Sequence, residues 1–106
     1  MSGKVATTYE RVKELKPSKA GSELGFDGQN YLVALSENDV YALAAGAYYV
    51  WSLCNGEKTV EQIVKEITTE LSSVSESKEK IEEEELREPV ALILEQLARV
   101  GLISYK

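Results

Sequence analysis

The spacing of apolar residues changes once along this chain, and the change limits the folds it can adopt. Residues 31–35 form a continuous apolar run with aromatic and branched side chains, which predicts a strand. Turn residues follow at 36–39, and residues 40–43 are expected to form the hairpin partner of that strand. From Ala44 onward the apolar residues recur at helical spacing. A strand hairpin followed by helices predicts an α+β domain.

The first predicted helix follows the hairpin directly. Its apolar residues share one face, and they are Ala47, Val50, Trp51 and Cys54. Asn55-Gly56 is expected to end this helix, with Gly56 in the left-handed position after the last turn. Trp51 is predicted to be core. Cys54 is interpreted as a small buried apolar residue rather than a nucleophile, because the chain has no histidine to activate it.

The second predicted helix has a clear start at Thr59. Gln62, three residues later, completes a capping box in which each residue satisfies a backbone amide of the other. The apolar face of this helix is expected to consist of Val60, Ile63, Val64, Ile67 and Leu71.

A charged stretch separates the second helix from the last one. Residues 72–88 are interpreted as a solvated linker because they are rich in Ser, Lys and Glu. The last helix is expected to begin near Glu88, since Pro89 lacks an amide hydrogen and is tolerated in a first turn. Gly101 is expected to end it, and residues 102–105 to leave as an extended tail.

The N-terminal part of the chain has a weaker pattern. We divide the chain into a partly extended N-terminal segment, 1–29, and a domain, 30–106, that includes the charged linker. A short strand is predicted at Glu10–Leu15, and Asp27-Gly28 is a turn dipeptide.

Composition narrows the classes of function. With no histidine and one cysteine, the chain lacks the usual ligands of a zinc site and the usual nucleophilic centres, so neither an enzyme nor a cofactor is expected. A net charge of −6 disfavours nucleic-acid binding. The longest apolar stretch, 42–51, is too short to span a bilayer, and no secretory signal is evident, so we expect no membrane partner and a cytoplasmic location.

Four short motifs follow one another in the second part of the chain. They are Tyr41-Ala42-Leu43, Trp51-Ser52-Leu53, the Asn-Gly-Glu-Lys-Thr-Val-Glu-Gln-Ile segment at 55–63, and the Leu-Ala-Arg-Val-Gly-Leu-Ile segment at 97–103. In order and spacing they resemble the PqqD-like family, the peptide chaperones also called RiPP recognition elements. The resemblance covers about residues 30–103, while the first 30 residues show little of the family's first strand.

The resemblance implies a winged-helix-like fold, with a three-stranded antiparallel sheet packed on three helices. In that family the leader part of a precursor peptide adds as a further strand beside the third strand and settles against the third helix. Those two elements correspond to Asp39–Leu43 and Pro89–Val100. Strand addition supplies affinity through backbone hydrogen bonds and selectivity through flanking pockets.

The last helix gives an argument for a groove that does not depend on the resemblance. Its apolar residues cover about half of the helix circumference, whereas packing on one side needs a stripe of only ~100°. The surplus lies on the edge that holds Ile93 and Val100 and continues to Leu92 and Gln96; a broad core contact is the alternative. The predicted peptide-binding residues are therefore Asp39, Val40, Tyr41, Ala42, Leu43, Leu92, Ile93, Gln96 and Val100.

These observations predict a non-catalytic adaptor that captures a precursor peptide and presents it to a modifying enzyme, in this family commonly a radical SAM protein. A winged-helix DNA-binding regulator is one alternative, and a structural module that dimerises through its sheet edge is another. Tyr41, Tyr48 and Tyr49 are read either as an aromatic recognition patch or as ordinary packing residues.

Overall fold

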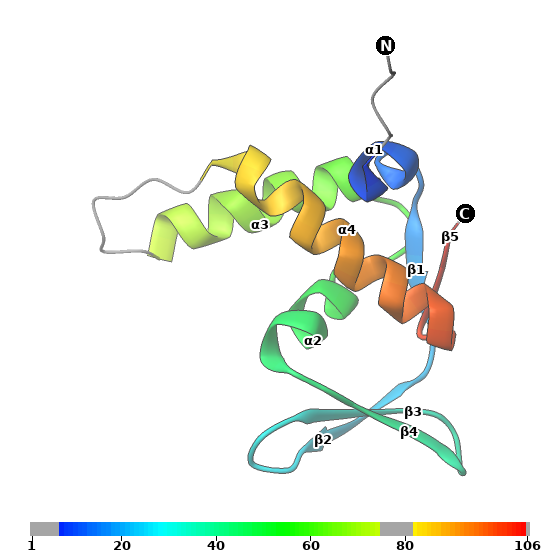
Figure 1. Ribbon diagram of the computed structural model, residues 1–106. Helices are drawn as coiled ribbons and strands as arrows, with labels where there is room; N and C mark the ends of the chain where they lie inside the picture. Colours follow the sequence, from blue (N-terminus) through cyan, green and yellow to red (C-terminus); the bar gives the residue numbers. More distant parts are fainter. Residues whose placement is uncertain (1–6, 75–81, 106) are drawn as a thin grey trace.

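The computed structural model describes residues 7–74 and 82–105, and within these ranges it has an α+β fold (Figure 1). The elements are α1 (Thr8–Val12), β1 (Pro17–Lys19), β2 (Ser22–Phe26), β3 (Tyr31–Ser36), β4 (Asp39–Leu43), α2 (Ala45–Ser52), α3 (Val60–Val74), α4 (Glu83–Val100) and β5 (Ile103–Tyr105). β2, β3 and β4 form a three-stranded antiparallel sheet in that order, which confirms the predicted fold class. β1 and β5 form a separate antiparallel pair.

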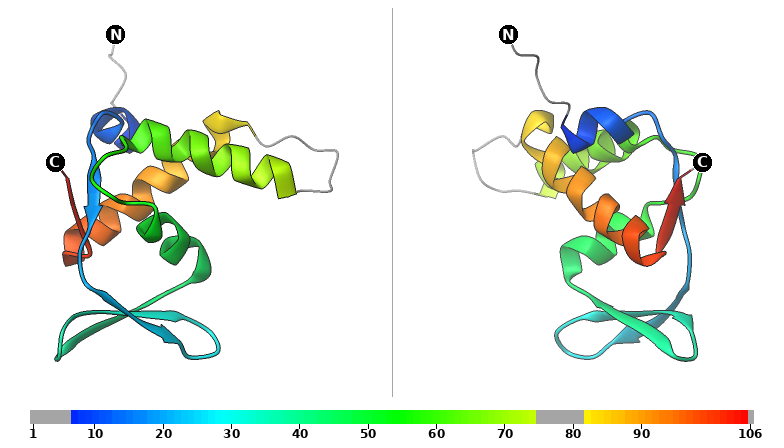
Figure 2. Two further views of the ribbon diagram at one scale, coloured as in Figure 1. Left: turned by 180° about the vertical axis from the view of Figure 1, so that it is seen from behind. Right: turned by 45° about the vertical axis from the view of Figure 1, so that its right-hand side comes forward.

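The sheet lies at one end of the molecule, with α2 as the helix nearest to it (Figures 1 and 2). The predicted hairpin is confirmed: Val33 lies opposite Tyr41, and Tyr31 lies opposite Leu43. The turn at Asp27 is confirmed as well, because its carboxylate accepts hydrogen bonds from the backbone amides of Asn30 and Gln29 at 2.8 and 2.9 Å. These bonds lower the pKa of Asp27.

β2 contains a bulge that changes which side chains share a face. Glu23 lies opposite Val33 and Gly25 lies opposite Leu32, so Leu24 has no partner on β3. An extra residue in one strand shifts the alternation of all the residues that follow it. As a result, Glu23 and Phe26 both lie on the face of the sheet that carries Val33.

The core lies between α2, α3 and α4. Trp51 is 3% exposed and Cys54 is fully buried, as predicted. Burial raises the pKa of the Cys54 thiol to about 12, so the thiol stays protonated, and it donates to the Val50 carbonyl. The buried apolar residues are Tyr9, Val33, Leu43, Val50, Trp51, Cys54, Val60, Ile63, Val64, Ile67, Val90, Ala91, Leu94, Leu97, Leu102 and Ile103.

The capping box at the start of α3 is confirmed. The Gln62 amide donates to the Thr59 hydroxyl at 3.1 Å, and the Thr59 amide donates to the Gln62 side chain at 2.8 Å. Of the apolar face predicted for this helix, the first four residues are buried and Leu71 is half-buried.

The end of α2 differs from the prediction. The helix ends at Ser52, with Leu53 as its C-cap, and not at Asn55-Gly56. The physical reason is competition from β1, since the Cys54 carbonyl accepts from Lys19 and the Gly56 amide donates to Pro17. Gly56 does have the predicted positive φ, 79°, but in the turn after the helix.

The predicted strand at Glu10–Leu15 is wrong, because helix α1 occupies Thr8–Val12. Thr7 and Glu10 form a capping box at its start, and the Glu88 carboxylate accepts hydrogen bonds from the amides of Thr8 and Tyr9 at 3.2 and 3.0 Å. A carboxylate from the far part of the chain therefore holds the first turn, a contact that short-range periodicity does not reveal.

The predicted start of the last helix near Glu88 is also wrong. α4 begins at Glu83, where Glu82 and Glu85 form a capping box, so Pro89 lies inside the helix. Residues 83–88 are therefore helical rather than linker, and so are residues 72–74 at the end of α3. The rest of the predicted linker, 75–81, lies outside the described residues.

The C-terminal end of α4 matches the prediction more closely. The helix ends at Val100 and Gly101 adopts φ 90°. The segment after it is extended as expected, but residues 103–105 also pair with β1 as strand β5, with Pro17 opposite Tyr105 and Lys19 opposite Ile103.

Candidate functional site

β4 is an edge strand of the three-stranded sheet. β3 pairs with one side of it, and no described residue pairs with the other side. Every second N–H and C=O of such a strand is directed outward, where another chain can pair with it. The two phases of this alternation are Val40 with Ala42, and Tyr41 with Leu43.

A groove of about 200 Å³ runs between β4 and α4 beside this free edge. Its lining residues are Tyr41, Ala42, Leu43, Ala47, Ile93, Gln96, Leu97, Val100 and Leu102. Part of the groove wall consists of three buried leucines, Leu43, Leu97 and Leu102, while Val100 remains 39% exposed. The groove therefore joins the outer surface to the core.

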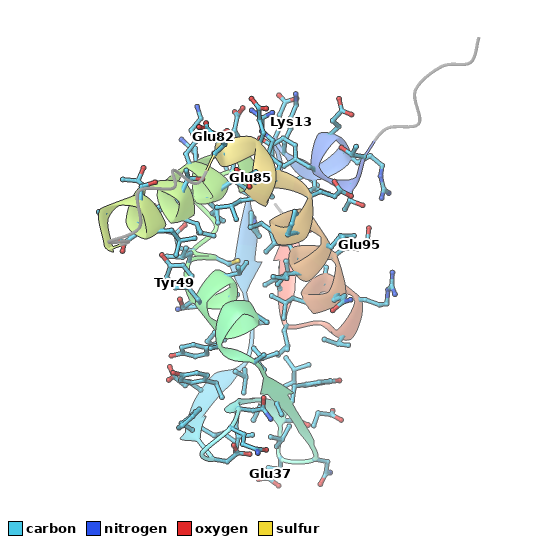
Figure 3. All side chains as sticks on the ribbon, turned by 60° about the vertical axis from the view of Figure 1, so that its left-hand side comes forward. Lys13, Glu37, Tyr49, Glu82, Glu85 and Glu95 are labelled. Atoms are coloured by element: carbon cyan, nitrogen blue, oxygen red, sulfur yellow. The ribbon has the colours of Figure 1, made fainter. Side chains whose placement is uncertain are left out.

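The chemistry of the groove is apolar. The Tyr41 hydroxyl and the Gln96 amide are the polar groups of its lining side chains, and no lining residue is charged. Glu95 on α4 is engaged elsewhere, since it pairs with Arg11 of α1 at 3.3 Å and with Arg99 at 3.5 Å. Figure 3 shows Glu95 on the side of α4 away from α2. Such a groove accepts apolar side chains and penalises charged ones.

Six of the nine predicted site residues line this groove, and they are Tyr41, Ala42, Leu43, Ile93, Gln96 and Val100. The other three do not. Asp39 is on β4, where its carboxylate accepts from the Ser36 hydroxyl at 3.1 Å. Val40 lies on the opposite face of β4, and Leu92 is on α4, 44% exposed, outside the lining.

Sequence reasoning missed three lining residues, Ala47, Leu97 and Leu102. Ala47 and Leu97 carry a usable signal in the sequence, since Ala47 lies on the apolar face expected for the first helix and Leu97 on the wide apolar arc of the last one. Leu102 follows Gly101, and the turn there carries it back under α4, where its amide donates to the Leu97 carbonyl at 2.8 Å.

The three tyrosines considered as a patch have separate surroundings. Tyr41 lines the groove, while Tyr48 stacks on Tyr31 with 4.1 Å between ring centroids and donates to Glu23 at 2.6 Å. Tyr49 points from α2 toward α3 (Figure 3). The pKa of its hydroxyl is raised, mainly by burial and to a smaller extent by the negative charge of Glu70. The three tyrosines therefore do not form one patch: Tyr48 and Tyr49 are packing residues, and Tyr41 belongs to the groove.

A larger cavity, about 340 Å³, lies where α1, α3 and α4 meet. Its lining is mostly charged: Thr7, Tyr9, Glu10, Lys13, Glu61, Glu84, Arg87 and Glu88. Glu88 is occupied in holding α1, and Arg87 pairs with Glu83 at 3.3 Å. We interpret this cavity as a junction between helices. No group of metal-ligating side chains occurs in the described ranges, and none of the helices described there is long and apolar enough to cross a membrane.

The comparison with known proteins bears on the part of the chain that contains the groove. No curated protein and no solved structure matches the chain. The sequence model of one family, PqqD, described as "Coenzyme PQQ synthesis protein D", matches residues 31–103, which include β3, β4, α2, α3 and α4. This match covers well over half of the 106 residues. The chain therefore belongs to the PqqD family, a family of RiPP recognition elements.

Proposed function

We propose that this protein is a non-catalytic adaptor that captures a precursor peptide and presents it to a modifying enzyme. The observation that carries the proposal is the position of an uncharged groove directly beside a free strand edge. Membership of the PqqD family supports it, because the family suggests a peptide-binding partner in PQQ synthesis.

The peptide binds as an added strand along β4. Its backbone pairs with the outward N–H and C=O groups of the strand, and alternate side chains enter the groove against Ile93 and Val100. Gln96 and the Tyr41 hydroxyl offer hydrogen bonds to the peptide at the edge of the apolar surface. Asp39 and Val40 take part through the strand edge, and Leu92 through its exposed position on the same helix.

The acceptor of the peptide is a modifying enzyme, and a radical SAM protein is the class that we propose. The adaptor supplies no reacting group in this scheme, which agrees with a buried thiol whose pKa is raised to about 12. It acts in the cytoplasm together with that enzyme.

The alternatives have less support. The described part of α3 carries Glu61, Glu66 and Glu70 beside one cation, Lys65, so it repels phosphate groups. A homodimer through β4 would use the same free edge, and it is one outcome of the test below.

Backbone amide shifts on addition of a short leader peptide, encoded near this gene or selected from a display library, test the proposal. Shifts concentrated at 39–43 and along 92–100 are expected. Shifts confined to α3 or to Lys13–Lys19 would contradict it, and so would a β4-paired dimer that the peptide does not displace. Sedimentation of the free protein identifies that dimer.

A further inference from the structure

The face of the three-stranded sheet opposite the groove carries an apolar hollow of about 320 Å³. Its lining residues are Ser22, Leu24, Ala34, Leu35, Ser36, Glu37 and Val40. Leu24 is 57% exposed and Val40 is 49% exposed, so two large apolar side chains remain in water here. No described helix covers this side of the sheet in Figures 1 and 2.

Strand alternation explains why Val40 lies here. Tyr41 is opposite Val33, which is fully buried, so these two face the helices. Val40 is opposite Ala34, and both line the outer hollow. Leu24, the unpaired residue of the β2 bulge, lines the same hollow from the other edge of the sheet.

The hollow is bounded by Val40 on the side of the free edge. A strand that pairs with β4 continues the pleat of the sheet, so its side chains pass alternately to the groove and to the outer face. A side chain directly opposite Val40 has its Cβ about 4.5–5.5 Å from that of Val40. The added strand therefore supplies the wall that the hollow lacks.

We propose that the captured peptide is recognised on both faces, with an aliphatic side chain across from Val40 that closes the outer hollow. This inference rests on the proposed function and specifies its substrate class. The peptide has apolar side chains both at the positions that enter the groove and at the alternate positions that face the outer hollow. Glu37 at the rim adds a charge argument, because its carboxylate repels an acidic side chain at this position. The preferred occupant is thus aliphatic, and Asp or Glu is disfavoured.

The experiment is a set of double-mutant cycles on the full chain. Peptides are selected on it from a random display library, one enriched peptide is synthesised, and each of its positions is replaced by alanine in turn. Affinities are then measured for the wild-type protein, Val40→Thr and Ile93→Asn. Threonine keeps the shape and strand preference of valine, so Val40→Thr is expected to fold normally. Ile93 reports on the groove face.

Val40→Thr is expected to weaken binding roughly two- to five-fold, the range for one apolar cross-strand pair. That loss should disappear when the peptide's outward aliphatic residue is already alanine, and persist when an inward residue is alanine. Inward positions should couple to Ile93 instead. Amide shifts at 39–43 without coupling to Val40 would overturn this inference alone. Failure to enrich any peptide that shifts these amides would overturn the proposed function as well.

Discussion

The indole N–H of Trp51 donates a hydrogen bond to the main-chain carbonyl of Leu102, 3.0 Å away. It also lies 3.2 Å from the Ala20 carbonyl. One side chain of α2 therefore fixes both the segment that follows α4 and the segment between β1 and β2. Because Leu102 lines the groove, Trp51 holds part of the candidate site in place without touching the proposed ligand.

Trp51→Phe should destabilise the protein by about 2–4 kcal/mol. The smaller ring leaves a cavity and removes the indole donor from two carbonyls. The Leu102 carbonyl keeps its bond from the Ala20 amide at 2.7 Å. Chemical denaturation measures the change. Tyr48→Phe is the matched control, since it removes a bond to the exposed Glu23, and a loss as large as that of Trp51→Phe would contradict the explanation.

Thr59→Ala should lower the free energy of unfolding by about 1 kcal/mol, because the hydroxyl that accepts from the Gln62 amide is lost. Thr69→Ala in the same helix is the control. The Thr69 hydroxyl bonds only back to the Lys65 carbonyl, so alanine there should be neutral or stabilising. Equal denaturation midpoints for Thr59→Ala and wild type would show that the cap contributes nothing.

Proline substitutions at Val40 and Tyr41 should have opposite consequences. Neighbouring residues of β4 direct their backbone amides to opposite sides of the strand. Where the lost amide points outward, peptide affinity should fall while the fold is largely kept. Where it points toward β3, a hydrogen bond of the sheet is lost and stability should fall. Peptide titration and thermal denaturation of both variants give the comparison. If neither variant loses peptide affinity while it keeps its melting temperature, the peptide does not pair with β4.

Val100→Glu should weaken peptide binding roughly ten-fold or more, because a carboxylate in an apolar groove is desolvated by the peptide. Val100 is 39% exposed, so the fold should tolerate the change. Arg99→Glu is the control: it makes a larger change of charge at the neighbouring position, outside the groove lining. Similar effects of the two variants would point to long-range electrostatics rather than to the groove.

Acid should weaken the fold partly through Glu88. The hydrogen bond from the Tyr9 amide is the main cause that lowers the pKa of this carboxylate below its usual 4.5. A lowered folded-state pKa means that the stabilisation is present above pH 4.5 and is lost as the pH falls through the folded-state value. Glu88→Gln should reduce this acid dependence in denaturation curves, whereas Glu84→Gln should retain it.

The sequence predicted the parts of this fold that local patterns specify. The hairpin before Ala44, the cap at Thr59 and the end of α4 at Gly101 depend on neighbouring residues, and all three are present. α1 could not be predicted in this way, because its amides bond to Glu88, far along the chain.

The sequence of β2 gave little indication of a strand. Its burial pattern is mostly exposed and its bulge interrupts the alternation that would mark a strand. The groove was anticipated from the resemblance and from the wide apolar arc of α4. Leu102 was missed because its contribution depends on the turn at Gly101 and on the Trp51 bond, neither of which a helical wheel contains.

The pairing of β1 with β5 has a consequence for synthesis on the ribosome. It joins residues 17–19 to residues 103–105, so the contact forms only after almost all of this sequence has emerged. Closing a loop of this length costs chain entropy before the contact stabilises anything, so the pairing is favoured once the elements inside the loop have formed. Leu102, next to β5, completes the groove only at that stage. Nascent or C-terminally truncated chains would therefore have helices and a hairpin but no finished groove, which delays binding competence until the last strand is in place.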